Sequence, residues 1–89
     1  MTPQDLLRDA LSETNVRLSM AKDEAIQIVA LEGARLAAAS AEPGFDVVLR
    51  ASRDVVAMKL GINASLEARA ADARIVGVIQ AILLGIATA

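Results

Sequence analysis

The last fifteen residues of the chain, 75–89, carry no charge, and small residues recur through them at every fourth position. If this stretch is helical, positions four apart stack on one face. The resulting ridge consists of Ala73, Gly77, Ala81, Gly85 and Ala89. Isoleucine, valine and leucine fill most of the remaining faces, so this helix must be covered by its own domain, by lipid or by other copies of the chain. Small residues also allow helices to approach closely, so the sequence predicts a protein specialised in helix packing and assembly.

Composition points to a helical oligomer. The 89 residues make one small domain, 55% of them are hydrophobic, and the mean hydropathy is +0.48. Phe45 is the one aromatic residue, so the apolar content is mainly Ala, Leu, Ile and Val. A chain of this length buries only about 60–65% of its unfolded surface by itself. We therefore expect it to associate with further copies of itself.

The residue types that carry most catalysis are missing. The chain has no His, Cys, Tyr or Trp, which leaves carboxylates and two lysines for acid–base chemistry. We expect no enzyme activity, no catalytic residue, no cofactor and no metal site. The net charge is −2 and there is no basic run, so a nucleic-acid partner is not expected either.

The apolar tail is also the candidate membrane segment. Fifteen helical residues span about 22 Å, less than the ~30 Å of a hydrocarbon core, so we do not expect a transmembrane helix. The N-terminus lacks the basic and apolar regions of a secretory signal, so no cleavable signal is expected. Location in the cytoplasm and export by a signal-independent route remain alternatives.

The first half of the chain predicts a helical arm over residues 3–40. Thr2 is suited to be the N-cap, Pro3 to be the first helical residue, and Asp5 to complete a capping box. Apolar or small residues then recur at steps of three and four, as in a coiled-coil seam. They are Leu7, Leu11, Thr14, Leu18, Ala21, Ala25 and Ile28. The alternative is a short first helix, followed by a second one that starts at Ser12 or Asn15.

A turn over residues 41–46 separates this arm from a second one over 47–89. Pro43 and Gly44 suit the two central positions of a type II turn, and Asp46 is a candidate cap for the second arm. The predicted apolar stripe of that arm is Val48, Ala51, Val55, Met58 and Ile62. A break at 61–63 is an alternative, in which Gly61 ends one helix and Asn63 caps the next. The expected fold is therefore all-α, a helical hairpin or three helices in a single domain over 1–89.

Residues 9–17, Asp-Ala-Leu-Ser-Glu-Thr-Asn-Val-Arg, resemble a segment of the R-body subunit ("killing trait") family. That family commonly reads Asp-Ala-Val-Thr-Gln-Thr-Asn-Val-Lys there, after a Pro-Gln pair like Pro3-Gln4, and Gly77-Val78 is similar to its C-terminal Gly-Val. Its members are small helical proteins that assemble into coiled ribbons. The resemblance implies that this chain assembles too, although it lacks the family's Gln-rich middle and aromatic tail.

The architecture also resembles that of type III secretion needle subunits and flagellar axial proteins, in which a turn with proline precedes an apolar C-terminal helix. We therefore expect a structural subunit of a homo-oligomer or polymer, with a soluble dimeric adaptor or chaperone-like module as the alternative. The residues expected at its interfaces are Ala73, Gly77, Ala81, Gly85, Ile75, Ile79, Ile82, Ile86, Leu7, Leu11, Leu18 and Ile28.

Overall fold

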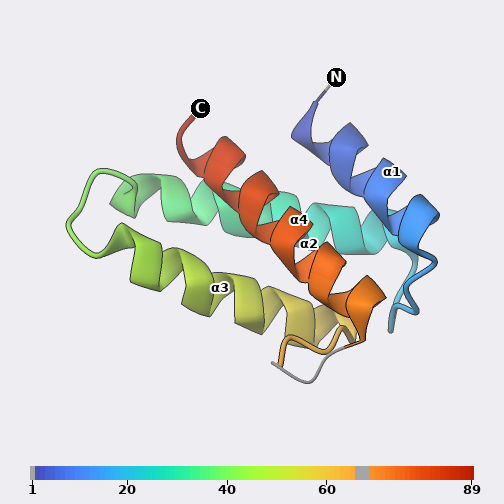
Figure 1. The fold of residues 1–89 in the computed structure, drawn as a ribbon. Coiled ribbons are helices and arrows are strands. Elements are labelled where there is room, and N and C mark those ends of the chain that lie inside the picture. Colours follow the sequence, from blue (N-terminus) through green and yellow to red (C-terminus); the bar gives the residue numbers. More distant parts are fainter. Residues whose placement is uncertain (1, 66–68) are drawn as a thin grey trace.

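The computed structural model describes residues 2–65 and 69–89, which form an all-α bundle (Figure 1). Its helices are α1 (Pro3–Thr14), α2 (Lys22–Leu36), a short 3-10 turn (Ala37–Ala39), α3 (Phe45–Leu60) and α4 (Ala70–Ala87). Helix α4 packs against all three other α-helices and lies between α1 and α3, across α2. The principal dimensions are 35 × 30 × 18 Å, so the bundle is about two helix layers thick. The expected all-α fold class is confirmed.

The start of the chain has the predicted cap. Thr2 is the N-cap of α1, its hydroxyl accepts a hydrogen bond from the Asp5 amide, and the Asp5 carboxylate accepts one from the Thr2 amide. Pro3 is the first helical residue, where its missing N–H costs nothing. This reciprocal pairing satisfies two amides that a helix N-terminus otherwise leaves unpaired. It also holds the pKa of the Asp5 carboxyl below its usual value, because those hydrogen bonds favour the charged form.

The continuous arm over 3–40 is wrong, and the short first helix is right. Helix α1 ends at Thr14 because Asn15 adopts a left-handed conformation, with φ of 55°. Asparagine tolerates this conformation better than most residues, so it suits the C-terminal boundary of a helix. Asn15 therefore ends α1 and does not start the next helix. An extended connection follows, and α2 begins after Ala21.

The turn around Pro43 and Gly44 is as predicted. Gly44 has φ of 80° and ψ of 8°, the values of the third residue of a type II turn, and the Phe45 amide donates to the Glu42 carbonyl across 3.3 Å. Asp46, however, is not the cap of α3. Gly44 occupies the N-cap position, and Asp46 lies in the first helical turn.

The second arm is interrupted at Gly61. The Ile62 amide donates to the Ala57 carbonyl and the Gly61 amide to the Met58 carbonyl, at 2.8 and 3.1 Å. This is the Schellman arrangement, in which glycine supplies the left-handed residue, here with φ of 82°. Asn63 does not cap a helix, because its side chain accepts from the Ser65 amide and α4 begins later, after Arg69.

Ser19, in the connection between α1 and α2, fastens this end of α3 to the rest of the bundle. Its amide donates to the Leu60 carbonyl at 2.9 Å, and its hydroxyl donates to the Lys59 carbonyl at 3.0 Å. Both carbonyls belong to the last turn of α3, where no intrahelical partner is available. The connection therefore acts as a cap for a helix 40 residues further along the chain.

We expect Gly61→Ala to destabilise the protein by about 1–2 kcal/mol, the cost of placing a side chain in the left-handed region. An added Cβ would also lie 3.1 Å from the Ser19 Cβ, so the loss should exceed that of Gly44→Ala. Gly44 has nearly the same φ, with nothing within 4 Å of the added atom. Urea unfolding of both variants measures the difference. Equal losses would mean that Ser19 does not pack on Gly61.

The predicted stripe of the second arm has the wrong register within α3. Val48, Val55 and Met58 are 44%, 45% and 70% exposed. The buried side of α3 is one position away, and its residues are Leu49, Ser52, Val56, Ala57 and Leu60. Of the predicted stripe, Ile62 is buried, and it lies beyond the end of α3.

Candidate interaction surface

The small-residue ridge of α4 lies on the outside of the bundle. Ala73, Gly77, Ala81 and Gly85 are all exposed, and Leu84 beside them is 42% exposed. The opposite side of α4 is fully packed. Its buried residues are Ile75, Val76, Ile79, Ile82, Leu83 and Ala87. Helix α4 is therefore covered on one side by its own domain, while its other side, which we call the α4 ridge, presents small residues to the surroundings.

The α4 ridge does not mediate close packing inside the chain, contrary to the simplest reading of its glycines. A Cβ added at Gly77 or Gly85 would meet nothing within 4 Å. The close contact between helices is instead at Gly33 of α2, where an added Cβ would lie 2.8 Å from the Ile86 Cβ. The sequence contains an indication of Gly33, because the apolar seam that runs from Leu7 to Ile28 does not continue at the same spacing past this glycine.

The other residues expected at interfaces lie mostly in the core of the single chain. Leu7, Ile75 and Ile79 are fully buried, and Leu11 and Ile82 are 3% and 4% exposed. Leu18, Ile28 and Ile86 are half-buried and pack against that core. These eight side chains therefore stabilise the subunit itself. The four members of the α4 ridge are the expected residues that the fold leaves accessible to a partner.

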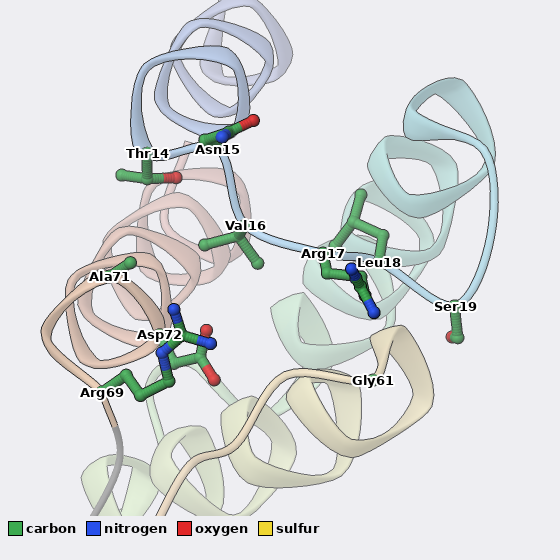
Figure 2. Close-up of a pocket in the computed structure, with 10 residues that line it drawn as sticks. All are labelled: Thr14, Asn15, Val16, Arg17, Leu18, Ser19, Gly61, Arg69, Ala71 and Asp72. Carbon is green, nitrogen blue, oxygen red and sulfur yellow. The ribbon is translucent and has the colours of Figure 1, made fainter.

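An open hollow of about 640 Å³ lies where the two longer connections meet the start of α4 (Figure 2). Its lining residues are Thr14, Asn15, Val16, Arg17, Leu18, Ser19, Gly61, Arg69, Ala71 and Asp72. The polar side chains among them are exposed or half-buried, so water competes for every hydrogen bond that a ligand would form. Among the described lining residues, none is a desolvated polar group of the kind that gives a small-molecule site its affinity.

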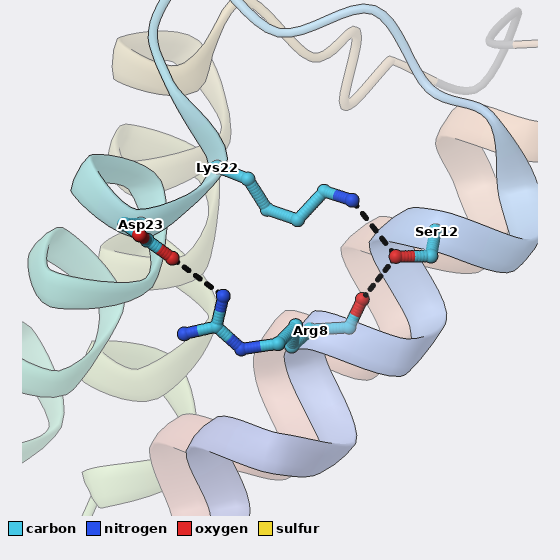
Figure 3. A network of polar contacts seen from close by, with 4 residues as sticks. All are labelled: Arg8, Ser12, Lys22 and Asp23. Carbon is cyan, nitrogen blue, oxygen red and sulfur yellow. Dashed lines mark hydrogen bonds and ion pairs between the residues drawn. The ribbon is translucent and has the colours of Figure 1, made fainter.

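A polar network on the surface joins α1 to the start of α2 (Figure 3). The Arg8 guanidinium is paired with the Asp23 carboxylate, and the Lys22 ammonium donates to the Ser12 hydroxyl at 2.8 Å. The Ser12 hydroxyl donates in turn to the Arg8 carbonyl at 3.0 Å. All four side chains are exposed, so the network orients the two helices and contributes little to stability.

Of two further polar contacts, one joins α3 to α4 and the other lies within α2. Arg53 of α3 donates to the Gln80 side chain of α4 at 2.6 Å, in a half-buried position. On α2, Glu32 is paired with Arg35, and this pair holds the pKa of the Glu32 carboxyl below its usual value because the guanidinium favours the charged form. The Ser52 hydroxyl on α3 also lowers the pKa of the Glu32 carboxyl.

Two further findings concern a possible metal site and a possible membrane span. Across residues 2–65 and 69–89, no three carboxylates gather as a metal ion would require. The expectation that the apolar segment is too short to span a membrane does not hold, because α4 has 18 residues with a mean hydropathy of 1.7 and could cross one by length and composition. In this fold, its Ile75–Ile79–Leu83 side instead packs into the core of the bundle.

Comparison of the chain with protein-family models, with curated proteins and with solved structures gives no match. The local resemblance of residues 9–17 to R-body subunits therefore stays an expectation, and so does the likeness to needle subunits.

Proposed function

We propose that this protein is a structural subunit of a homo-oligomer or polymer, which assembles when the α4 ridge of one copy packs against a helix of another. The observation that carries this proposal is the exposure of Ala73, Gly77, Ala81 and Gly85 in one row on the outer side of the central helix. Such a row brings two helix backbones close together and gives many van der Waals contacts for little loss of side-chain entropy.

The composition of the ridge supports a protein partner of the same kind. Glycine in the interior of a helix costs about 1 kcal/mol relative to alanine, so two exposed glycines in α4 weaken the isolated subunit. In the fold of one chain neither glycine relieves a contact, because both face open space. A second helix against the ridge would use the space that they leave.

The test compares Gly77→Leu and Gly85→Leu with the unmodified protein. A Cβ added at either position meets no neighbour within its own chain, so we expect helicity and subunit stability to be kept. Overpacking at the contact between copies should cost about 1–3 kcal/mol, equivalent to a roughly 5- to 150-fold weaker association. Sedimentation velocity over a range of concentrations measures this, with Gln27→Leu on the exposed side of α2 as the control.

Unchanged association of both glycine variants would refute the α4 ridge as an interface. Negative-stain microscopy of the unmodified protein distinguishes the two assemblies that were expected. Filaments or ribbons would support a polymer, whereas a particle with twice the subunit mass would support the dimeric adaptor.

A further inference from the structure

Helix α3 carries a second apolar surface, which faces away from the bundle core. It consists of Val48, Ala51, Val55 and Met58, and we call it the α3 face. All four residues are exposed, and Met58 is 70% exposed. Single exposed apolar residues are common on proteins. Helix α3, however, exposes four large ones, because Val47 beside the α3 face is 60% exposed. The other three are Val48, Val55 and Met58. Figure 1 shows α3 along an edge of the bundle, where a partner could reach it.

The spacing of the α3 face is that of a coiled-coil seam. Its residues follow one another at steps of three, four and three, so Val48 and Val55 occupy the a positions and Ala51 and Met58 the d positions of a heptad. Within parallel coiled coils, β-branched residues at a favour two strands over three or four. A peptide of this length would scarcely be helical alone, but the fold already holds α3 as a 16-residue helix. Pairing therefore needs no further ordering of the backbone.

Opposite charges stand on the two sides of the α3 face. Asp54 is at the g position and Lys59 at the following e position, which are the positions that meet between parallel helices. Both residues are exposed, and the carboxylate of Asp54 is paired with its chain neighbour Arg53 at 2.9 Å. An antiparallel partner would instead bring the Asp54 carboxylates of the two copies near each other, which is unfavourable.

We infer that the α3 face binds the α3 face of a second copy of this chain, with the two helices parallel and related by a two-fold axis. Val48, Ala51, Val55 and Met58 each lie against the same residue of the other copy. Asp54 of each copy faces Lys59 of the other, which gives two ion pairs across the interface. The arrangement is self-complementary, as a two-fold interface must be.

This pairing stands on different residues from the α4 ridge. If the proposed function also holds, each subunit has two separate surfaces for copies of itself. Alternating contacts through α3 and α4 would then extend an assembly beyond a dimer. That consequence rests on the proposed function, whereas the α3 pairing does not.

The first experiment uses Met58→Lys, which places a charge at the last position of the seam, where the side chain is already 70% exposed in the subunit. Helicity should be unchanged, while association through α3 should weaken by at least about tenfold. Gln27→Lys on the exposed side of α2 is the matched control. Run beside Gly77→Leu, this series separates the surfaces. If only Met58→Lys weakens the association, the α3 pairing is supported and the α4 ridge is refuted. If only Gly77→Leu weakens it, the α4 ridge is supported and the α3 pairing is refuted.

The second experiment reports the orientation of the helices, because the chain has no cysteine of its own. Ala51→Cys should form a disulfide with Ala51→Cys of another copy under mild oxidation, and Gln27→Cys should not. Cross-linking that occurs only when Ala51→Cys protein is mixed with Val55→Cys protein would mean antiparallel helices and would overturn the inference. A monomer that does not cross-link would overturn it as well.

The third experiment tests the ion pairs by exchanging their charges. Asp54→Lys and Lys59→Glu should each weaken the association, and the double variant should recover it. Helicity has to be monitored for Lys59→Glu, because the positive charge of Lys59 also acts on Glu32 within the chain. Failure of the double variant to recover, with helicity intact in all three, would refute the proposed pairing of Asp54 with Lys59.

Discussion

Ile79→Ala is expected to cost about 2–5 kcal/mol of the free energy of unfolding, the largest loss of the substitutions considered. The Ile79 side chain is 0% exposed and lies on the inner side of α4, the helix that contacts α1, α2 and α3. Removing its outer carbons leaves a cavity among helices that cannot all close on it. Domains are stable by only about 0.05–0.15 kcal/mol per residue, so this loss is a large part of the total.

Leu84→Ala is the matched control, because the two residues share a helix and a similar side-chain volume. Leu84 is 42% exposed, so its truncation should cost much less than that of Ile79. Urea unfolding followed by circular dichroism at low protein concentration measures the subunit alone. If the two variants lost equal stability, the inner and outer sides of α4 would have been assigned wrongly.

The parts of the fold that depend on local chemistry could be predicted from the sequence. The Thr2–Asp5 capping box and the Pro43-Gly44 turn have few alternatives, because each uses the particular hydrogen-bonding or φ preference of its residues. Asn15 was considered as the start of a helix but ends one. The sequence indicates that Asn15 lies at a helix boundary, but it does not indicate whether Asn15 ends one helix or starts the next.

The burial of α3 could not be predicted, because this helix carries two rows at helical spacing. One row is Val48, Ala51, Val55 and Met58, and the other is Leu49, Ser52, Val56 and Leu60. The first is more uniformly apolar and is therefore the predicted buried row, yet the second packs into the core. Periodicity identifies an apolar row but does not say whether the subunit or a partner covers it.

The same ambiguity affected the candidate interface on α4. Its uncharged sequence predicted a helix covered on all sides, and the fold covers one side while leaving the glycines outside. Which side of α4 is covered depends on where α1, α2 and α3 pack, and the sequence of α4 does not contain that information. The contact at Gly33 was not predicted for the same reason, because a single glycine does not indicate which helix packs against it.

Gly33→Val is expected to destabilise the subunit by about 1–3 kcal/mol or more through overpacking between α2 and α4. The added Cβ would lie 2.8 Å from the Ile86 Cβ and 2.9 Å from its Cγ2, well inside the ~3.5–4.0 Å of a favourable carbon contact. The Ile86 Cβ is fixed to the backbone of α4, so a change of rotamer cannot move it away. The helices must separate, and contacts of buried neighbours such as Val29 and Leu83 would weaken with them.

Gly77→Val and Gly85→Val provide the controls, because all three positions are glycines inside helices and valine differs little from glycine in helix propensity. A Cβ added at either control position meets no atom within 4 Å, so the unfolding free energies should stay within about 0.5 kcal/mol of the unmodified protein. Their effect should appear in the association of subunits. A Gly33→Val protein as stable as these two would show that α2 and α4 do not approach at Gly33. The order of stabilities among three identical substitutions therefore reports which glycine lies inside the subunit and which two face outward.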